Sequence, residues 1–112
     1  MKNKTIAIIG SRNYKYALEA MQKIDLSDVT LIISGGARGV DKDAEIFAKL
    51  NNIPCQVIRP INQSDKFSYL LRNVEIITKA DKIYALWDGE SKGTKFVIDY
   101  AKARNKEVII YV

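Results

Sequence analysis

Residues 31–41 have the sequence LIISGGARGVD, an apolar run that stops abruptly in a glycine-rich turn with one arginine and one acid. Residues 31–33 are bulky and apolar without polar alternation, which is typical of a strand buried on both faces of a sheet. Residues 42–48 follow with acids near their start, as expected of a helix whose first turn favours negative charge. The stretch therefore predicts a strand, a glycine turn and a helix.

The glycine turn is a candidate anion site. Three of the six residues after Ile33 are glycines, which tolerate positive φ and let a ligand approach the backbone closely. We expect free N–H groups to point out of this turn, and Arg38 adds a fixed positive charge. Such an arrangement suits a phosphate. The alternative is a tight connection between strand and helix that binds nothing.

Composition limits the class of protein. The chain has 112 residues, of which 47% are hydrophobic and 28% charged, as in a soluble globular protein with one domain over 1–112. No apolar run approaches the roughly 20 residues that span a bilayer, and no signal peptide is recognisable, so we expect a cytoplasmic protein without a membrane partner. One cysteine and no histidine exclude an intrachain disulfide and a cysteine-built metal site. The sequence names no cofactor, metal ligand or catalytic residue.

Strand-like and helix-like segments alternate along the chain. We expect strands at 5–9, 29–33, 55–58, 82–86 and 107–112 and helices at 15–24, 42–51, 65–77 and 94–104. The strongest helix pattern has Ser64 or Asp65 as its N-cap and apolar residues at i, i+3, i+4, i+7 spacing: Phe67, Leu70, Leu71, Val74 and Ile77.

The strands are too apolar to face water, which predicts an α/β fold: a five-stranded parallel sheet of order 3-2-1-4-5 with helices on both faces, a three-layer sandwich. Ligands of such sheets bind at the carboxyl ends of the strands, where the strand order reverses. The polar turns at 10–13, 34–41 and 87–94 all emerge at that edge.

The two other turns offer further candidate contacts. The helix that begins near Gly93 and Thr94 has free amides, and Ser91 and Lys92 add a hydroxyl and a cation; ordinary N-capping by Ser91 or Thr94 is the competing role. The turn at 10–13 contributes Gly10, Ser11 and Arg12, unless that arginine is only a surface residue.

Residues beside these turns have less certain roles. Trp87 stacks on a base or ribose, or simply covers the sheet edge. Asp41 and Asp88 accept from ribose hydroxyls, or cap a helix and form a turn. Arg59 is a ligand contact or a cap of its strand, and Arg72, in the middle of a helix, is by position a solvated side chain.

Several short motifs occur in the order found in one superfamily: IGSR at 9–12, SGGARGVD at 34–41, RN at 72–73, AD at 80–81, WDG at 87–89 and SKGT at 91–94. Together they resemble the SLOG superfamily, and most closely its YspA-like branch of small stand-alone domains. The pattern is also similar to the core of the DNA-processing (DprA/Smf) proteins. The resemblance covers essentially the whole chain.

The resemblance implies a Rossmann-like fold whose strand-end loops bind nucleotides, nucleotide-derived molecules or nucleic acid. It implies a phosphate cradle and adds Arg72 as a basic contact. The residues that we expect to bind ligand are Gly10, Ser11, Arg12, Gly35, Gly36, Ala37, Arg38, Gly39, Asp41, Arg72, Trp87, Asp88, Gly89, Ser91, Lys92, Gly93 and Thr94.

An enzymatic branch, the LONELY GUY phosphoribohydrolases, resembles the chain only in part. Its PGGxGTxxE signature ends in a catalytic glutamate, and aligning Gly93 and Thr94 with its GT places Val97 at that glutamate. Asp88 or Glu90 would have to replace it, which makes a hydrolase the third function to consider.

We therefore expect first a binding domain for a nucleotide or nucleotide-derived phosphate ligand. Single-stranded DNA binding, as in the DNA-processing proteins, is the second, supported by a net charge of +5 and a pI of 9.3. The apolar strand at 107–112 would lie at a sheet edge, which favours a homodimer or larger assembly.

Overall fold

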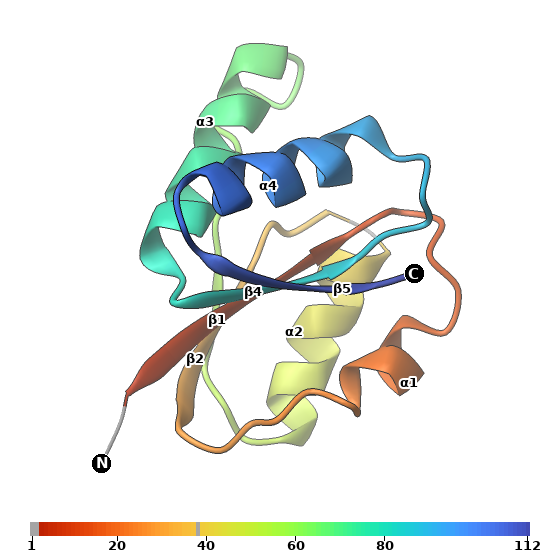
Figure 1. Cartoon of the computed structure of the whole chain (residues 1–112), viewed down its shortest axis with the longest axis vertical. Coiled ribbons are helices and arrows are strands. Elements are labelled where there is room, and N and C mark those ends of the chain that lie inside the picture. Colours follow the sequence, from red (N-terminus) through yellow and green to blue (C-terminus); the bar gives the residue numbers. More distant parts are fainter. Residues whose placement is uncertain (1–2, 38) are drawn as a thin grey trace.

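The computed structural model describes residues 3–37 and 39–112. Five strands form one parallel sheet of order β3-β2-β1-β4-β5, which confirms the predicted order (Figure 1). Their bounds, within one or two residues of those predicted, are Lys4–Gly10 for β1, Val29–Ser34 for β2, Cys55–Val57 for β3, Lys82–Leu86 for β4 and Glu107–Tyr111 for β5.

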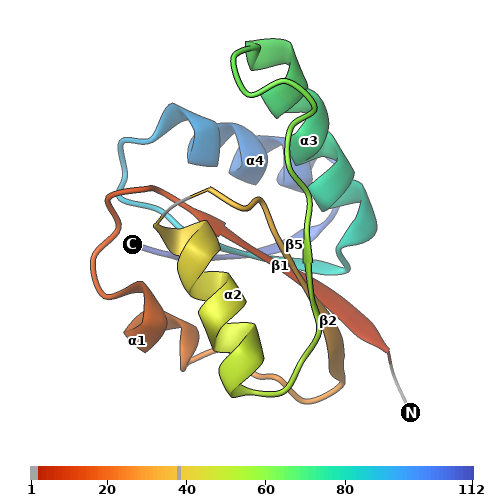
Figure 2. The ribbon, with the colours of Figure 1, turned by 180° about the vertical axis from the view of Figure 1, so that it is seen from behind.

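Helices cover both faces of this sheet, as predicted. The four helices are α1 (Ala17–Met21), α2 (Val40–Leu50), α3 (Lys66–Lys79) and α4 (Lys92–Ala103). Helices α1 and α2 lie on one face and α3 and α4 on the other, as both views of the ribbon show (Figures 1 and 2). Among the described helices, none is long and apolar enough to cross a membrane.

The core is divided into two layers because successive strand residues point to opposite faces. On β1, Ile6 and Ile8 pack toward α1 and α2, whereas Ala7 and Ile9 pack toward α3 and α4. All four side chains are buried, which explains why the sequence of this strand shows no polar alternation.

Helix α1 is shorter than predicted: it covers Ala17–Met21 rather than 15–24. Its N-cap residue, Tyr16, has a left-handed backbone (φ 61°) and no capping side-chain hydrogen bond. After Met21 the chain changes to i to i−3 bonds, such as Ile24 N–H to Met21 O at 2.9 Å, so the last predicted turn is tighter than an α-helix.

Helix α3 begins where predicted but does not bury its apolar stripe. Asp65 is the N-cap and accepts from the N–H of Phe67, which decides between Ser64 and Asp65. Only Ile76 and Ile77, near the C-terminal end, are buried. Three members of the predicted stripe are exposed because the first half of the helix extends beyond the sheet (Figures 1 and 2): Phe67, Leu70 and Leu71.

Candidate functional site

A cleft of about 650 Å³ lies at the carboxyl ends of β1 and β4. Residues from the turns at 10–13, 34–41 and 87–94 line it together, and α3 supplies a fourth wall. The cleft is therefore at the edge of the sheet predicted from the strand order. The expected residues that line it are Gly10, Ser11, Arg12, Gly35, Ala37, Asp41, Arg72, Asp88, Ser91, Gly93 and Thr94.

The hydroxyl of Ser11 joins the ends of β1 and β4 below the cleft. Ser11 is buried, its backbone N–H donates to Leu86 O at 3.0 Å, and its Oγ accepts from the N–H of Asp88 at 3.2 Å. The same Oγ lies 3.4 Å from the hydroxyl of Thr94. Ser11 thereby fixes the turn after β4 against the start of α4.

The N-terminus of α4 opens into the cleft. Ser91 is its N-cap: Ser91 Oγ accepts from the N–H of Thr94 at 3.3 Å and from the hydroxyl of Thr94 at 3.1 Å. Both roles that the sequence offered, capping and lining, are thus found in one residue. A Cβ built on Gly93 would meet no atom within 4 Å, so the backbone here is open to a ligand. Because Ser91 Oγ takes the N–H of Thr94, the first-turn donors that an anion would use here are the N–H groups of Lys92 and Gly93.

The glycine turn differs from the expectation of free amides. The N–H of Gly36 donates to Ser34 Oγ at 3.2 Å, and the N–H of Ala37 donates to Asp41 Oδ2 at 3.2 Å. These two amides are therefore satisfied by side chains of the turn itself. Short polar side chains that bond the nearby backbone account for this, and two such residues, Ser34 and Asp41, flank the glycines.

Two arginines from other elements hold the carbonyls of the same turn. Arg72 Nη1, from α3, donates to Gly35 O at 2.7 Å, and Arg59 Nη1, after β3, donates to Gly36 O at 2.9 Å. Arg59 therefore holds the glycine turn after β2, rather than capping the end of its own strand. Arg72 Nε donates to Asn73 Oδ1 at 2.8 Å, and Nη1 also lies 3.4 Å from Ile58 O. Contrary to its expected solvated role, Arg72 is half-buried and reaches the cleft.

Asp41 and Arg72 meet over Gly35. A Cβ on Gly35 would lie 2.6 Å from Asp41 Oδ2 and 2.8 Å from Arg72 Nη1. Asp41 is only 7% exposed, and this burial raises its pKa to about 6, against the lowering effects of the Ala37 N–H and the Arg72 charge. Burial also lowers the pKa of Arg72. A carboxyl whose pKa is raised by burial thus lies in the cleft wall.

Asp88 forms the turn after β4. Its Oδ1 accepts from the N–H groups of Glu90 and Ser91, both at 2.8 Å, and these bonds lower its pKa, so it stays ionised. This is the turn-forming role that the sequence offered as one of two alternatives. The residue also lines the cleft.

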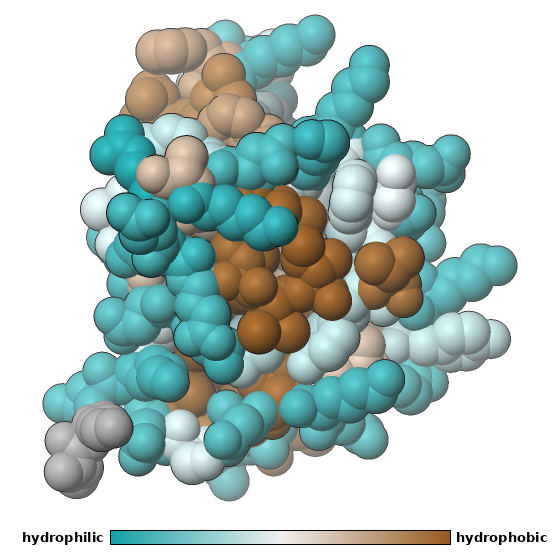
Figure 3. Space-filling model, in the orientation of Figure 1, coloured by the Kyte–Doolittle hydropathy of each residue, from teal (hydrophilic) through white to brown (hydrophobic). Residues whose placement is uncertain are grey.

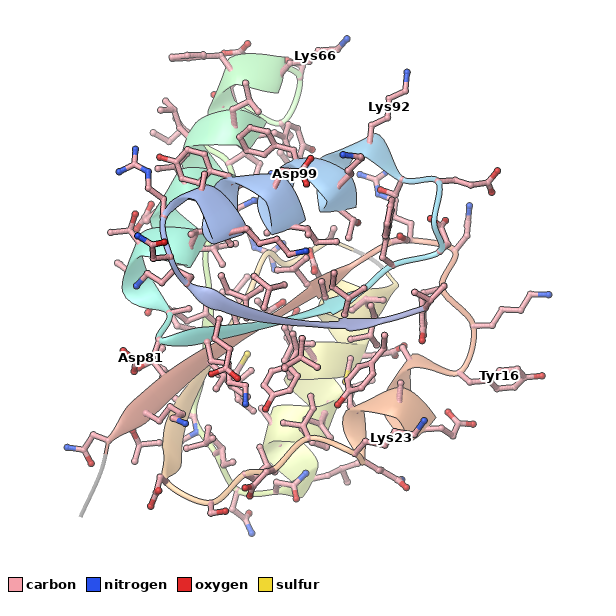
Figure 4. The ribbon with its side chains drawn as sticks, viewed as in Figure 1. Tyr16, Lys23, Lys66, Asp81, Lys92 and Asp99 are labelled. Carbon is pink, nitrogen blue, oxygen red and sulfur yellow. The ribbon has the colours of Figure 1, made fainter. Side chains whose placement is uncertain are left out.

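Six expected contacts are not among the lining residues that the structure describes. The Trp87 ring packs beside α4, and its Nε1 donates to Ser91 O at 3.0 Å, so it covers the sheet edge rather than the cleft. Lys92 points away from the fold (Figure 4). Gly36, Gly39 and Gly89 lie in the turns without lining the cleft, and Arg38 lies outside the described residues.

Seven lining residues were not selected from the sequence: Ile9, Asn13, Tyr69, Asn73, Ile76, Glu90 and Val97. Asn13 and Glu90 belong to polar turns, and Asn73 to a motif, that the sequence analysis had identified. Tyr69 could have been found only from its position on α3, one helical turn before Arg72. Val97, which aligns with the hydrolase glutamate, does face the cleft but carries an apolar side chain.

The charges of the described lining are mixed. Two arginines, Arg12 and Arg72, face three acids, Asp41, Asp88 and Glu90. A strongly positive channel, which a long phosphate backbone requires, is not formed by these residues. The lining suits a compact ligand with both an anionic group and hydroxyl donors.

Comparison with models of known protein families and with curated protein sequences finds no match. Among solved structures, the chain is similar to the X-ray structure of DNA processing protein A (DprA) from Streptococcus pneumoniae, with a TM-score of 0.82 and 19% sequence identity. The similarity covers 96% of this chain and 50% of that chain. This chain thus has a DprA-like, Rossmann-like fold and spans half the length of that protein.

Proposed function

We propose that the cleft binds a nucleotide or a nucleotide-derived molecule through its phosphate. The observation that carries this proposal is the open N-terminus of α4, where Gly93 has no neighbour within 4 Å of a built Cβ. The first-turn amides and the positive end of the helix dipole favour an anion there. The exposed Arg12, from the turn after β1, adds a positive charge to the same cleft.

The rest of the lining supplies groups for a sugar and a base. Carboxylates accept hydrogen bonds from ribose hydroxyls, and Asp88 and Glu90 lie at the α4 end of the cleft. Asn13 and Asn73 offer amide groups, and Tyr69 offers for stacking the ring face that the Arg72 guanidinium, 5.3 Å from the ring centroid, does not cover. On this proposal the chain acts as a YspA-like member of the SLOG superfamily.

The ligand can be identified by thermal shift at fixed moderate salt, with nucleoside mono- and triphosphates, ADP-ribose, NAD, cyclic nucleotides and a short single-stranded oligonucleotide. A ligand at ~100-fold above its dissociation constant stabilises the folded state by roughly 2.7 kcal/mol, which raises Tm by several degrees. We expect one small nucleotide to produce such a shift. Silence from every small molecule would contradict the proposal.

Gly93→Ala is expected to weaken the best nucleotide by about tenfold or more without unfolding the chain, because the new methyl group enters open space beside the amides. Calorimetric titration measures the affinity, and Tm reports on folding. Lys92→Ala is the matched control, because Lys92 is exposed and does not line the cleft. We expect the Lys92→Ala variant to bind the nucleotide with an affinity within about threefold of wild type. Equal affinity of wild type and Gly93→Ala would place the phosphate elsewhere.

Single-stranded DNA binding is the second candidate, because the structure that shares this fold is a DNA processing protein. Binding that depends on several phosphate contacts would weaken by about tenfold or more between low and physiological salt. We expect the mixed lining to give a small nucleotide a weaker salt dependence than that. An oligonucleotide that alone binds, with a steep salt slope, would favour this candidate.

A further inference from the structure

Strand β5 leaves one edge of the sheet open. It is the last strand in the order β3-β2-β1-β4-β5, and its side chains alternate between the two core layers: Ile109 and Tyr111 pack on one, Val108 and Ile110 on the other. All four are only half-buried, because no further strand of the described chain lies beside them. Brown atoms accordingly gather over β5 in the space-filling view, which looks onto this edge (Figure 3).

The two edges of the sheet differ in how they are protected. Strand β3, at the opposite edge, has only three residues, lies between Pro54 and Pro60, and exposes Gln56 at its centre. Short edge strands, prolines and polar side chains all limit pairing with another chain. Strand β5 has five residues in unbroken register with β4, and residues 108–112 include no proline, glycine or charge. An edge of this kind accepts a further extended strand.

The hydrogen bonds of β5 show which of its backbone groups face outward. Trp87 N–H donates to Tyr111 O at 2.8 Å, so the backbone groups of Tyr111 face β4. The N–H and C=O of one strand residue point to the same side, and that side alternates along the strand. The groups that face away from β4 are therefore those of Val108, Ile110 and Val112.

These outward groups match those of a second copy about a twofold axis at Ile110. In an antiparallel pair of strands, two residues that exchange both backbone hydrogen bonds lie directly opposite one another. An axis at Ile110 places this residue opposite its own copy and Val108 opposite Val112, so every outward N–H meets an outward C=O. The spacing of the outward groups therefore suits a second β5 as the added strand.

The side chains favour the same register. With the axis at Ile110, Ile109 lies opposite Tyr111 of the second copy, and a β-branched residue opposite an aromatic ring is a favourable cross-strand pair. An axis at Ile109 would instead set the charge of Glu107 opposite Tyr111. The axis at Ile110 pairs apolar with apolar residues over the whole of 108–112.

We propose that two copies of this chain form a dimer by antiparallel pairing of β5 with β5, about a twofold axis at Ile110, which joins the two sheets into one. The sequence pattern favoured assembly through this strand, and the backbone of β5 adds the orientation and the register. Among the described residues, those that line the cleft do not include any of β5, so the dimer leaves the cleft open.

Proline at position 110 tests the backbone pairing. The N–H of Ile110 faces away from β4, so Ile110→Pro removes no hydrogen bond within one copy but removes the two central bonds of the dimer. Ile110→Ala is the matched control, because it also loses the isoleucine side chain but keeps the N–H. Sedimentation equilibrium at micromolar concentrations should show a dimer for wild type, a weaker dimer for Ile110→Ala and a monomer for Ile110→Pro. Equal dissociation constants of the two variants would overturn the proposal.

A charge pair tests the register without a proline. Val108→Lys/Val112→Glu places a cation opposite an acid at both ends of the paired strands, whereas Val108→Lys/Val112→Lys places two cations there. The two double variants differ only at Val112, which is 86% exposed, so their difference reports on the partner strand and not on folding. The first is expected to dimerise about 3- to 30-fold more tightly. Equal affinities would overturn the proposed pairing.

Other surfaces are tested by Leu71→Glu, at an exposed residue of α3, which should dimerise as wild type does. A dimer lost in Leu71→Glu would place the interface on α3 and overturn the proposal. A wild-type monomer throughout the concentration range would also overturn it, and would leave the β5 edge to an extended segment of a different protein.

Discussion

Replacing Gly10 with alanine is expected to lower the free energy of unfolding by about 3 kcal/mol, at the upper end of what overpacking costs. A Cβ at this position would lie 2.4 Å from Leu86 O and 2.8 and 2.9 Å from the two methyl carbons of Val40. The first contact is the decisive one. Leu86 O accepts the N–H of Ser11 at 3.0 Å and belongs to β4, so the carbonyl cannot move without breaking the join between β1 and β4.

Chemical denaturation of wild type and Gly10→Ala measures this loss as a lower midpoint with an unchanged slope. Gly93→Ala is the control at the same edge of the sheet, because its built Cβ meets nothing and alanine favours a helix. Equal stability of Gly10→Ala and wild type would contradict the close packing of Gly10 against Leu86 O and Val40 at the base of the cleft.

The strand order could be predicted because it depends on the pattern of whole segments, which recurs along the chain, and not on single side chains. Continuous apolar runs such as 5–9 and 31–33 fit only a sheet covered on both faces, and alternation with helices makes it parallel. Once the order is known, the carboxyl ends of the strands must share an edge. The meeting of Ser11, Asp41 and Thr94 in one cleft follows from that order, without knowledge of any side-chain contact.

The hydrogen-bond partners of individual groups could not be predicted in the same way. The glycine turn has the composition of a phosphate cradle, yet Ser34 and Asp41 already occupy two of its amides. The sequence also gave Arg72 no role by position, because only the packing of α3 brings its guanidinium to Gly35 O. Periodicity predicted the apolar stripe of α3, but it could not show that Phe67, Leu70 and Leu71 would be exposed, because that depends on how far the helix extends beyond the sheet.

Asp41→Asn is expected to stabilise the protein at pH 7.5 by about 1–3 kcal/mol, because the variant removes a buried negative charge. The ordinary pKa of this carboxyl is 3.8, and burial raises it to about 6 in the folded chain. Between these values the folded chain holds a proton that the unfolded chain has lost. Stability due to Asp41 is therefore complete below about pH 4 and falls as the pH rises through about 6.

The difference in stability between wild type and Asp41→Asn isolates this carboxyl, because all other acids titrate in both proteins and cancel. The asparagine keeps an oxygen that can accept from the Ala37 N–H, so the geometry of the turn is retained. Denaturant midpoints measured from pH 4 to 8 should show the advantage of asparagine growing with pH. A constant difference, or a less stable variant at pH 7.5, would contradict the buried charge. An asparagine would hold the Ala37 N–H as well, so the turn itself does not need the carboxylate. On the proposed function, the carboxylate of Asp41 accepts from a hydroxyl of the ligand, and ligand binding should therefore be weaker in Asp41→Asn.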